Sequence, residues 1–108
     1  MMNDVDVLTR ARALIASPEN WCQGYYAKDI NGRWCEATAD QAHCFCALGA
    51  LIHVDKTSNA VVWLHSVLPR TCQSIPKFND ENTHAAILSL FDKAIKKAAG
   101  HDNKGRTR

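Results

Sequence analysis

The chain has 108 residues, of which 46% are hydrophobic and 22% charged, and its formal net charge is +2. This length and ordinary composition indicate one compact domain, which we place at residues 1–100, and argue against disordered, collagenous and coiled-coil classes of protein. The chain has no apolar run near the roughly 20 residues that a membrane-spanning helix needs. Its acidic start is unlike the basic start of a signal peptide, so we expect a cytoplasmic protein that does not contact membranes.

The charges are distributed unevenly along the chain. Residues 1–92 hold seven basic and ten acidic side chains, whereas residues 93–108 hold six basic side chains and one acidic side chain. The segment 101–108 contains no apolar side chain, which predicts a disordered basic tail. Such a basic end either complements the dipole of a helix C-terminus, the explanation we favour, or attracts nucleic acid regardless of its sequence. The basic residues concerned are Lys93, Lys96, Lys97, Lys104, Arg106 and Arg108.

The chain contains five cysteines, an odd number that predicts reduced thiols rather than a disulfide framework. Their densest cluster is Cys44 and Cys46, directly after His43. Structural zinc sites usually take two cysteines from a turn, with two to four residues between them, and a second pair further along the chain. Cys44 and Cys46 instead fall in a helical pattern, in which they would point about 200° apart. We therefore expect no bound metal and no other cofactor.

The first elements expected are a helix and a hairpin. Residues 4–16 carry apolar side chains at helical spacing, with two aspartates near the start. Residues 21–30 and 33–36 contain aromatic strand formers, and Asn31-Gly32 lies between them. Asn-Gly is typical of a type I′ turn, in which both central residues have a positive φ. We therefore predict a small β-hairpin after the first helix.

The segment 42–52 is predicted to be a central buried helix. Every residue in it except His43 is apolar or glycine, and Thr38 and Gln41 have capping-box spacing just before it. Gly49 lowers the helix propensity by ~1 kcal/mol relative to alanine, so we expect another backbone to pack closely against it.

Two more helices are expected in the second half of the chain. The third helix begins at Ser58 or Asn59 and stops at Pro69, and a polar loop follows at 69–82. The last helix has apolar side chains at helical spacing and ends at Gly100. Together these elements predict a mainly helical domain of about four helices, with one small β-hairpin between the first two.

Three short motifs stand in order along the chain. They are Trp21-x-x-Gly24-x-x-Ala27-x-Asp29 with Asn31-Gly32, then Cys46-x-x-Gly49-Ala50-Leu51, then Phe78-Asn79-Asp80 followed by Thr83-His84. Together they resemble a family of small bacterial and phage-associated domains of unknown function, whose members carry Trp-Cys-x-x-Gly-Ala-Leu and a later Asn-Asp before a final helix. The resemblance covers most of residues 7–95, and Phe45 replaces the family's Trp. It implies one domain and names no reaction.

One hypothesis from these motifs is a thiol site of a small cysteine-dependent hydrolase. Cys46 would be the nucleophile, His84 the base, and Asp80 or Asn79 would orient the imidazole. A nucleophilic thiol normally lies at a helix N-terminus, whereas the predicted helix places Cys46 about two turns inside. Its apolar sequence neighbours would also raise its pKa. Packing in the core therefore explains Cys46 better than catalysis does.

The alternative role of the same polar residues is structural. Side chains such as Asn and Asp accept hydrogen bonds from the free N–H groups at a helix start, so Asp80 or Thr83 would cap the last helix. His84, in its first turn, would bond Asp80 or the segment near Trp21. We favour this interpretation of Asn79 and Asp80 over a functional role.

The aromatic residues of the predicted hairpin form the preferred contact surface. A lone hairpin needs a packing partner, so some of these rings must cover the helices. Strand alternation sends Tyr25 and Tyr26 to opposite faces, and exposed Tyr and Trp are enriched in binding hot spots. We therefore expect a non-enzymatic interaction or regulatory module that binds another macromolecule, with a protein preferred to nucleic acid. The expected binding residues are Trp21, Tyr25, Tyr26, Trp34 and Asn79.

Overall fold

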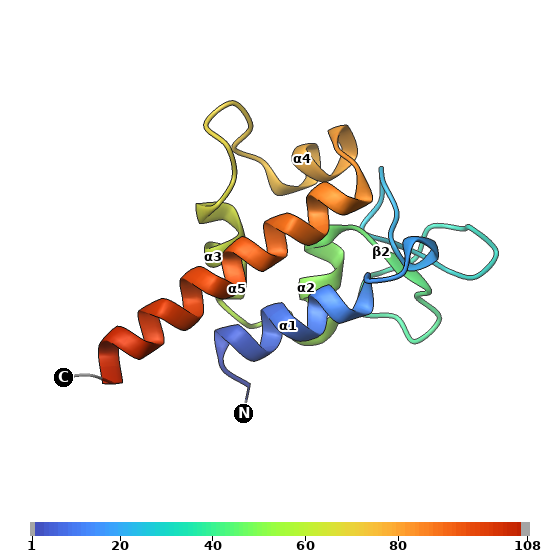
Figure 1. The fold of residues 1–108 in the computed structure, drawn as a ribbon. Helices are drawn as coiled ribbons and strands as arrows, with labels where there is room; N and C mark the ends of the chain where they lie inside the picture. Colours follow the sequence, from blue (N-terminus) through green and yellow to red (C-terminus); the bar gives the residue numbers. More distant parts are fainter. Residues whose placement is uncertain (1, 107–108) are drawn as a thin grey trace.

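The computed structural model describes residues 2–106 and places side chains for residues 2–101. In this part of the chain it has five α-helices, one short 3-10 helix and a two-stranded antiparallel sheet (Figure 1). The mainly helical class is confirmed, with five helices rather than about four. In chain order the elements are α1 (Asp4–Leu14), η1 (Pro18–Asn20), β1 (Ala27–Lys28), β2 (Cys44–Phe45), α2 (Ala47–Asp55), α3 (Ala60–Ser66), α4 (Ile75–Glu81) and α5 (His84–Arg106).

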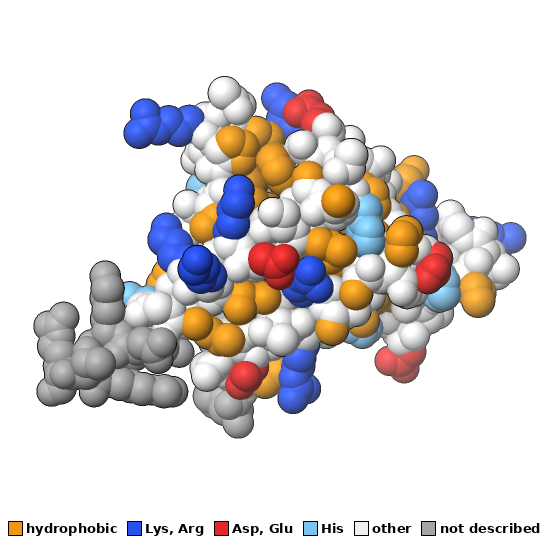
Figure 2. Space-filling view, in the orientation of Figure 1, with side chains coloured by type: hydrophobic (Ala, Val, Ile, Leu, Met, Phe, Trp, Pro, Cys, Tyr) orange, Lys and Arg blue, Asp and Glu red, His pale blue; other side chains and the backbone are white. Residues whose placement is uncertain are grey.

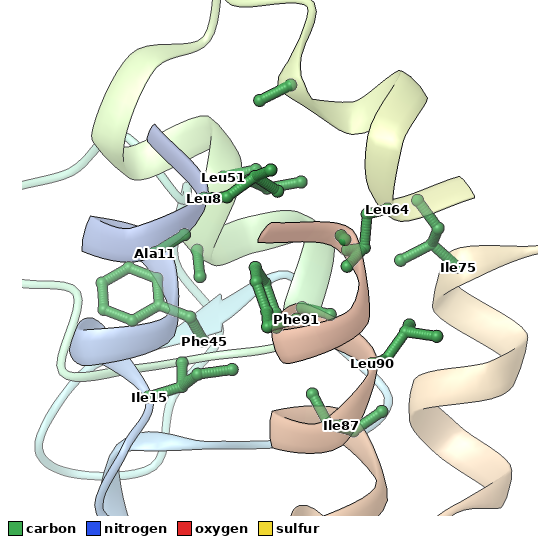
Figure 3. Packing of buried hydrophobic residues seen from close by; sticks show 14 of the residues in the cluster. Leu8, Ala11, Ile15, Phe45, Leu51, Leu64, Ile75, Ile87, Leu90 and Phe91 are labelled. Atoms are coloured by element: carbon green, nitrogen blue, oxygen red, sulfur yellow. The ribbon is translucent and has the colours of Figure 1, made fainter. Parts of the chain in front are cut away.

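The core lies between the helices. The longest helix, α5, crosses the molecule and packs against α1 and α3, while α2 packs against α1 (Figure 1). Figure 3 shows their apolar side chains meeting, among them the fully buried Leu8 of α1 and Phe91 of α5. At the surface, Arg12 of α1 and Asp92 of α5 form an ion pair with an N–O distance of 2.6 Å. Burial of the apolar faces, rather than this exposed pair, holds the helices together.

The predicted hairpin between 21–30 and 33–36 is only partly present. β1 pairs with β2, which lies further along the chain, and the segment 33–36 adds one isolated bridge, between Trp34 and Lys28. A strand takes the partner that lets it bury its apolar face, and β2 is buried whereas Trp34 is exposed. The register of the sheet is Ala27 opposite Phe45 and Lys28 opposite Cys44.

The turn predicted at Asn31-Gly32 is present, but it is not of type I′. Gly32 has a φ of +80°, whereas no residue other than glycine has a positive φ in the described part of the chain. The carboxylate of Asp29 holds the turn, because its Oδ1 accepts hydrogen bonds from the N–H groups of Asn31 (2.9 Å) and Arg33 (3.0 Å). Hydrogen bonds to the side chain of Asp29 thus stabilise a turn in which only one of the two central residues has a positive φ.

The helix predicted at 42–52 is wrong at its start. The helix α2 begins at Ala47 with Cys46 as its N-cap, and β2 occupies the two residues before the cap. Thr38 and Gln41 consequently begin no helix. A short apolar run is compatible with either a buried strand or a buried helix, and periodicity does not separate the two. Residues 44 and 45 form a strand rather than a helix because they pair with β1.

The close backbone contact predicted at Gly49 is confirmed. A Cβ atom at this position would overlap the backbone carbonyl of Tyr26. The same carbonyl accepts a hydrogen bond of 3.2 Å from the N–H of Cys46. The absence of a side chain at Gly49 therefore lets the segment before β1 lie directly on the first turn of α2.

The polar loop predicted at 69–82 contains a helix, α4. Ser74 caps it, since its Oγ accepts a hydrogen bond of 3.3 Å from the N–H of Lys77. Pro76 lies in the first turn, where a missing N–H removes no hydrogen bond of the helix. Asn79 therefore lies on a helix and is fully buried, rather than standing in a loop.

The last helix begins as predicted and ends later. The Oγ1 of Thr83 accepts a hydrogen bond of 3.1 Å from the N–H of Ala86, so Thr83 is the cap and Asp80 is not. The helix continues beyond Gly100 to Arg106, into the segment predicted as a tail. Residues 107–108 lie outside the described residues, and the domain boundary at residue 100 stays a prediction. No helix in the described part is long and apolar enough to cross a membrane.

Candidate functional site

A pocket of about 290 Å³ lies between the turn before β1, the start of α2 and α4. It brings together three of the predicted binding residues, Tyr25, Tyr26 and Trp34, and two of the candidates for catalysis, Cys46 and Asp80. These side chains come from the turn before β1, the loop after it, the N-cap of α2, and α4. The residues that line the pocket are Gly24, Tyr25, Tyr26, Trp34, Cys46, Pro76 and Asp80.

Three aromatic side chains at this pocket are open to solvent. The exposed fractions are 50% for Tyr25, 48% for Tyr26 and 60% for Trp34. Both tyrosines are exposed because they precede the two-residue strand β1 instead of alternating within a longer strand. The Nζ of Lys28 lies 5.1 Å from the centroid of the Tyr25 ring, a cation–π distance. We call Tyr25, Tyr26 and Trp34 the aromatic surface.

The carboxamide of Asn79 holds the wall of the pocket together. Its Oδ1 accepts hydrogen bonds from the indole Nε1 of Trp21 (2.7 Å) and the backbone N–H of Ala47 (3.0 Å). Its Nδ2 donates to the carbonyl of Cys22 (3.0 Å) and to Oδ1 of Asp80 (3.2 Å). A buried amide is stable only when it is bonded in this way. Asn79 and Trp21, which the sequence suggested as binding residues, do not line the pocket but support it.

The turn before β1 is docked on the C-terminal end of α4. The Nε2 of Gln23 lies 3.0 Å from each of three backbone carbonyls, those of Asn79, Asp80 and Asn82. Oδ1 of Asp80 accepts a hydrogen bond of 2.8 Å from the N–H of Gly24. Asp80 therefore fixes this turn and does not cap α5. Sequence analysis missed Gln23, because one glutamine within a predicted strand carries no sign of a partner on a distant helix.

The structure does not bring His84 to the thiol. Its Nε2 lies 2.7 Å from the carbonyl oxygen of Ile15, and its ring packs against that of Trp21 with the centroids 5.5 Å apart. His84 is not among the residues that line the pocket. The imidazole thus links the end of α1 to the Trp21 segment, while Cys46 and Asp80 face the pocket without it.

The prediction that Cys46 lies two turns inside a helix is wrong. Cys46 lies at the N-terminus of α2, as its N-cap. Its Sγ accepts a hydrogen bond of 3.3 Å from the N–H of Gly49, and the residue is only 3% exposed. Burial raises the pKa of the Cys46 thiol, and hydrogen bonds from the N–H groups of Gly49 and Leu48 offset part of that rise. The helix position that favours a thiolate is therefore present, but burial outweighs it.

The other thiols near the site are also buried. Burial, together with a hydrogen bond to the Cys44 side chain, raises the pKa of Cys22 to about 12. Burial also raises the pKa of Cys35. In the part of the chain with described side chains, no three His, Cys, Asp or Glu residues are arranged to hold a metal ion. These thiols are thus protonated near neutral pH and pack as small apolar groups.

A comparison with protein families gives a match over most of the chain. The model of a family of unknown function, DUF6197, matches residues 2–97, which include every residue that lines the pocket. Neither the curated proteins nor the solved structures give a significant match. The family description assigns no activity. By the extent of this match, the chain belongs to the DUF6197 family of unknown function.

Proposed function

We propose that this domain is a non-enzymatic interaction module that binds a protein partner through the aromatic surface. The observation that carries the proposal is the exposure of Tyr25, Tyr26 and Trp34 around one pocket. Rings of this size are normally among the more buried side chains of a domain, and Tyr and Trp dominate binding hot spots. The bacterial or phage setting that the sequence resemblance implies, and a regulatory role, belong to this proposal.

The support beneath the aromatic surface favours binding. The turn that carries Tyr25 and Tyr26 is fixed to α4 by the bonds of Asn79, Gln23 and Asp80. A surface that is already ordered loses little conformational entropy when a partner binds, so more of the contact energy contributes to affinity. A role in binding would explain why so many polar bonds hold the turn that carries Tyr25 and Tyr26.

Two other functions have weaker support. A cysteine hydrolase needs a base at the thiol, and His84 is engaged with Ile15 and Trp21 instead. A nucleic-acid binder needs a basic face. Figure 2 shows the Lys and Arg side chains of the visible face mixed with acidic and apolar ones. Of the six basic residues near the end of the chain, only Lys93, Lys96 and Lys97 have described side chains.

Site-specific photo-crosslinking tests the proposal. The photoreactive amino acid p-benzoylphenylalanine is introduced at Tyr26 or at Trp34, and the protein is irradiated in the cells that naturally produce it. Both positions are expected to give one and the same crosslinked protein, because both side chains belong to one contact surface. Gel mobility shift and mass spectrometry of the product provide the measurement.

The matched control is the same substitution at Val62 on α3. Val62 is 61% exposed, as much as Trp34, but it does not line the pocket. The proposal fails if irradiation crosslinks nothing at Tyr26 and Trp34, or if Val62 captures the same protein with equal yield.

A further inference from the structure

We infer that the pocket within the aromatic surface receives a cationic side chain, a lysine or arginine, of the protein partner. This inference rests on the proposed function, and it adds the chemistry of the group that enters the pocket. It follows from the ring faces, from the one charged side chain in the wall, and from the size of the cavity.

The first argument is the aromatic wall. The face of an aromatic ring carries negative potential, and a Lys or Arg group within about 6 Å of the ring centroid is attracted to it. Lys28 already occupies such a position over Tyr25, at 5.1 Å, and its charge disfavours a second cation at that ring. Among the described residues, no cation lies over the rings of Tyr26 and Trp34. Both side chains are open to solvent, 48% exposed for Tyr26 and 60% for Trp34, so a cation that enters from outside can reach these two rings.

The second argument is the carboxylate of Asp80, the one charged side chain among the described residues that line the pocket. Its Oδ1 accepts hydrogen bonds from Gly24 (2.8 Å) and Asn79 (3.2 Å), which fix the carboxylate in place. Its Oδ2 has no hydrogen-bond partner among the described residues. A fixed carboxylate with one free oxygen beside aromatic faces is complementary to an ammonium or a guanidinium.

An anionic ligand fits the same pocket poorly, although a helix begins there. The N–H of Ala47 donates to Asn79, and the N–H of Gly49 donates to the Sγ of Cys46. The first turn of α2 thus has these donors already in use, whereas an anion site at a helix N-terminus needs them free. The charge of Asp80 would also repel an anion.

The volume of the pocket limits the size of the occupant. Pockets that enclose a drug-sized ligand measure roughly 300–1,000 Å³, and this one measures about 290 Å³. It suits one long side chain better than a large metabolite. Because the pocket opens within the aromatic surface, a side chain that enters it would bring the backbone of its protein against Tyr26 and Trp34.

The experiment measures binding of blocked single residues by NMR, using the indole N–H signal of Trp34. N-acetyl-arginine and N-acetyl-lysine methylamides are expected to bind with a Kd in the millimolar range. The norleucine derivative has a similar side chain without a charge. It is expected to bind about fivefold more weakly, because it lacks one cation–π contact and one exposed ion pair. The inference is overturned if norleucine, the glutamate derivative or N-acetylglucosamine binds as tightly as arginine.

The variant Asp80→Asn tests the carboxylate with little change in shape. Asparagine keeps the Oδ1 that accepts from Gly24, so we expect an unchanged fold and a three- to fivefold loss of arginine binding. Glu81→Gln is the matched control, since Glu81 is the next residue on α4 and does not line the pocket. If Asp80→Asn lowers the melting temperature, Tyr26→Ala replaces it, because this variant keeps the Trp34 signal, with Val62→Ala as control. Equal arginine binding by a folded variant and its control overturns the inference.

A second ligand distinguishes a protein side chain from a free cation. A pentapeptide with a central arginine, two glycines on each side and blocked ends is expected to bind at least as tightly as the single residue. If N-acetyl-arginine methylamide binds and the peptide does not, the inference that the cation is a side chain of a protein is overturned. If these ligands fail while Tyr26 and Trp34 still crosslink one protein, the proposed function stands and only the cationic chemistry is lost.

Discussion

At the scale of single residues, the carboxamide of Asn79 has the most partners in the described network. It is fully buried and bonds the Trp21 indole, the start of α2 and the carbonyl of Cys22. Each partner would have to find another bond if the carboxamide were lost, and a buried polar group without one costs about 1–3 kcal/mol. The stability of the pocket therefore depends on this one side chain.

We predict that Asn79→Ala lowers the free energy of unfolding by about 3 kcal/mol, because it leaves buried donors and an acceptor without partners. Denaturation by urea, followed by circular dichroism, provides the measurement. Asn59→Ala is the matched control and should change stability by less than about 0.5 kcal/mol. Asn59 is exposed and its side chain makes no capping bond. Similar losses in both variants would refute the role given to Asn79.

A second prediction concerns the thiol of Cys46. Burial raises its pKa, so the reactive thiolate is scarcer at pH 7 than in a free thiol. We expect iodoacetamide to label Cys46 in the folded protein more slowly than it labels N-acetylcysteine, as followed by mass spectrometry. Because the pKa is raised, the rate should still be rising at the pH where the rate of N-acetylcysteine has levelled off. Labelling of Cys46 at pH 7 faster than the free thiol would support the hydrolase instead.

The predictability of single residues depended on whether the signal lies in the residue itself or in its own helix. Gly49 was found because a glycine inside a helix by itself indicates close packing, although the backbone that packs there, the Tyr26 carbonyl, comes from another segment. Thr83 was found because a cap acts within its own helix. Asn79 bonds Trp21 and Cys22, and Gln23 bonds the end of α4, across more than fifty residues of sequence, and no local pattern encodes such distances.

At the scale of elements, the contact between α2 and the segment before β1 positions the pocket. Gly49 permits this contact, and Gly100 offers a contrast because a Cβ atom there would meet nothing within 4 Å. The two glycines lie in helices with different surroundings. They therefore separate the effect of packing from the effect of helix propensity.

We predict opposite effects of alanine at these two glycines. Gly49→Ala should destabilise the protein by about 2 kcal/mol, since the overlap with Tyr26 exceeds the gain in helix propensity. Gly100→Ala should stabilise it by up to about 1 kcal/mol, because α5 continues through this position. Thermal unfolding curves distinguish the cases. Destabilisation by Gly100→Ala would instead mark Gly100 as the end of the helix.

The spacing of apolar residues predicted some of these elements and not others. The helices α1 and α5 were predicted because each has one apolar face along its length. The strand β2 was predicted as helix because the apolar run 44–48 fits both structures. The helix α4 was missed because it has seven residues, too few to show a period among polar side chains.

At the scale of the whole molecule, the helical core supports one surface that the core itself does not need. The aromatic surface lies on the turn before β1 and on the loop after it, docked on α2 and α4. Tyr25, Tyr26 and Trp34 were predicted as binding residues because they are aromatic side chains on the predicted hairpin. Their convergence with Cys46 and Asp80 depends on the pairing of β1 with β2, which no local pattern indicated.

The most direct test compares two triple variants for binding of the crosslinked partner. One variant replaces Tyr25, Tyr26 and Trp34 with alanine, and the other replaces Lys93, Lys96 and Lys97. Quantitative mass spectrometry of material co-purified from the producing cells measures the partner, after circular dichroism has shown both variants to be folded. We predict that the aromatic variant loses the partner and the lysine variant keeps it. Retention by the aromatic variant, with loss by the lysine variant, would contradict the account.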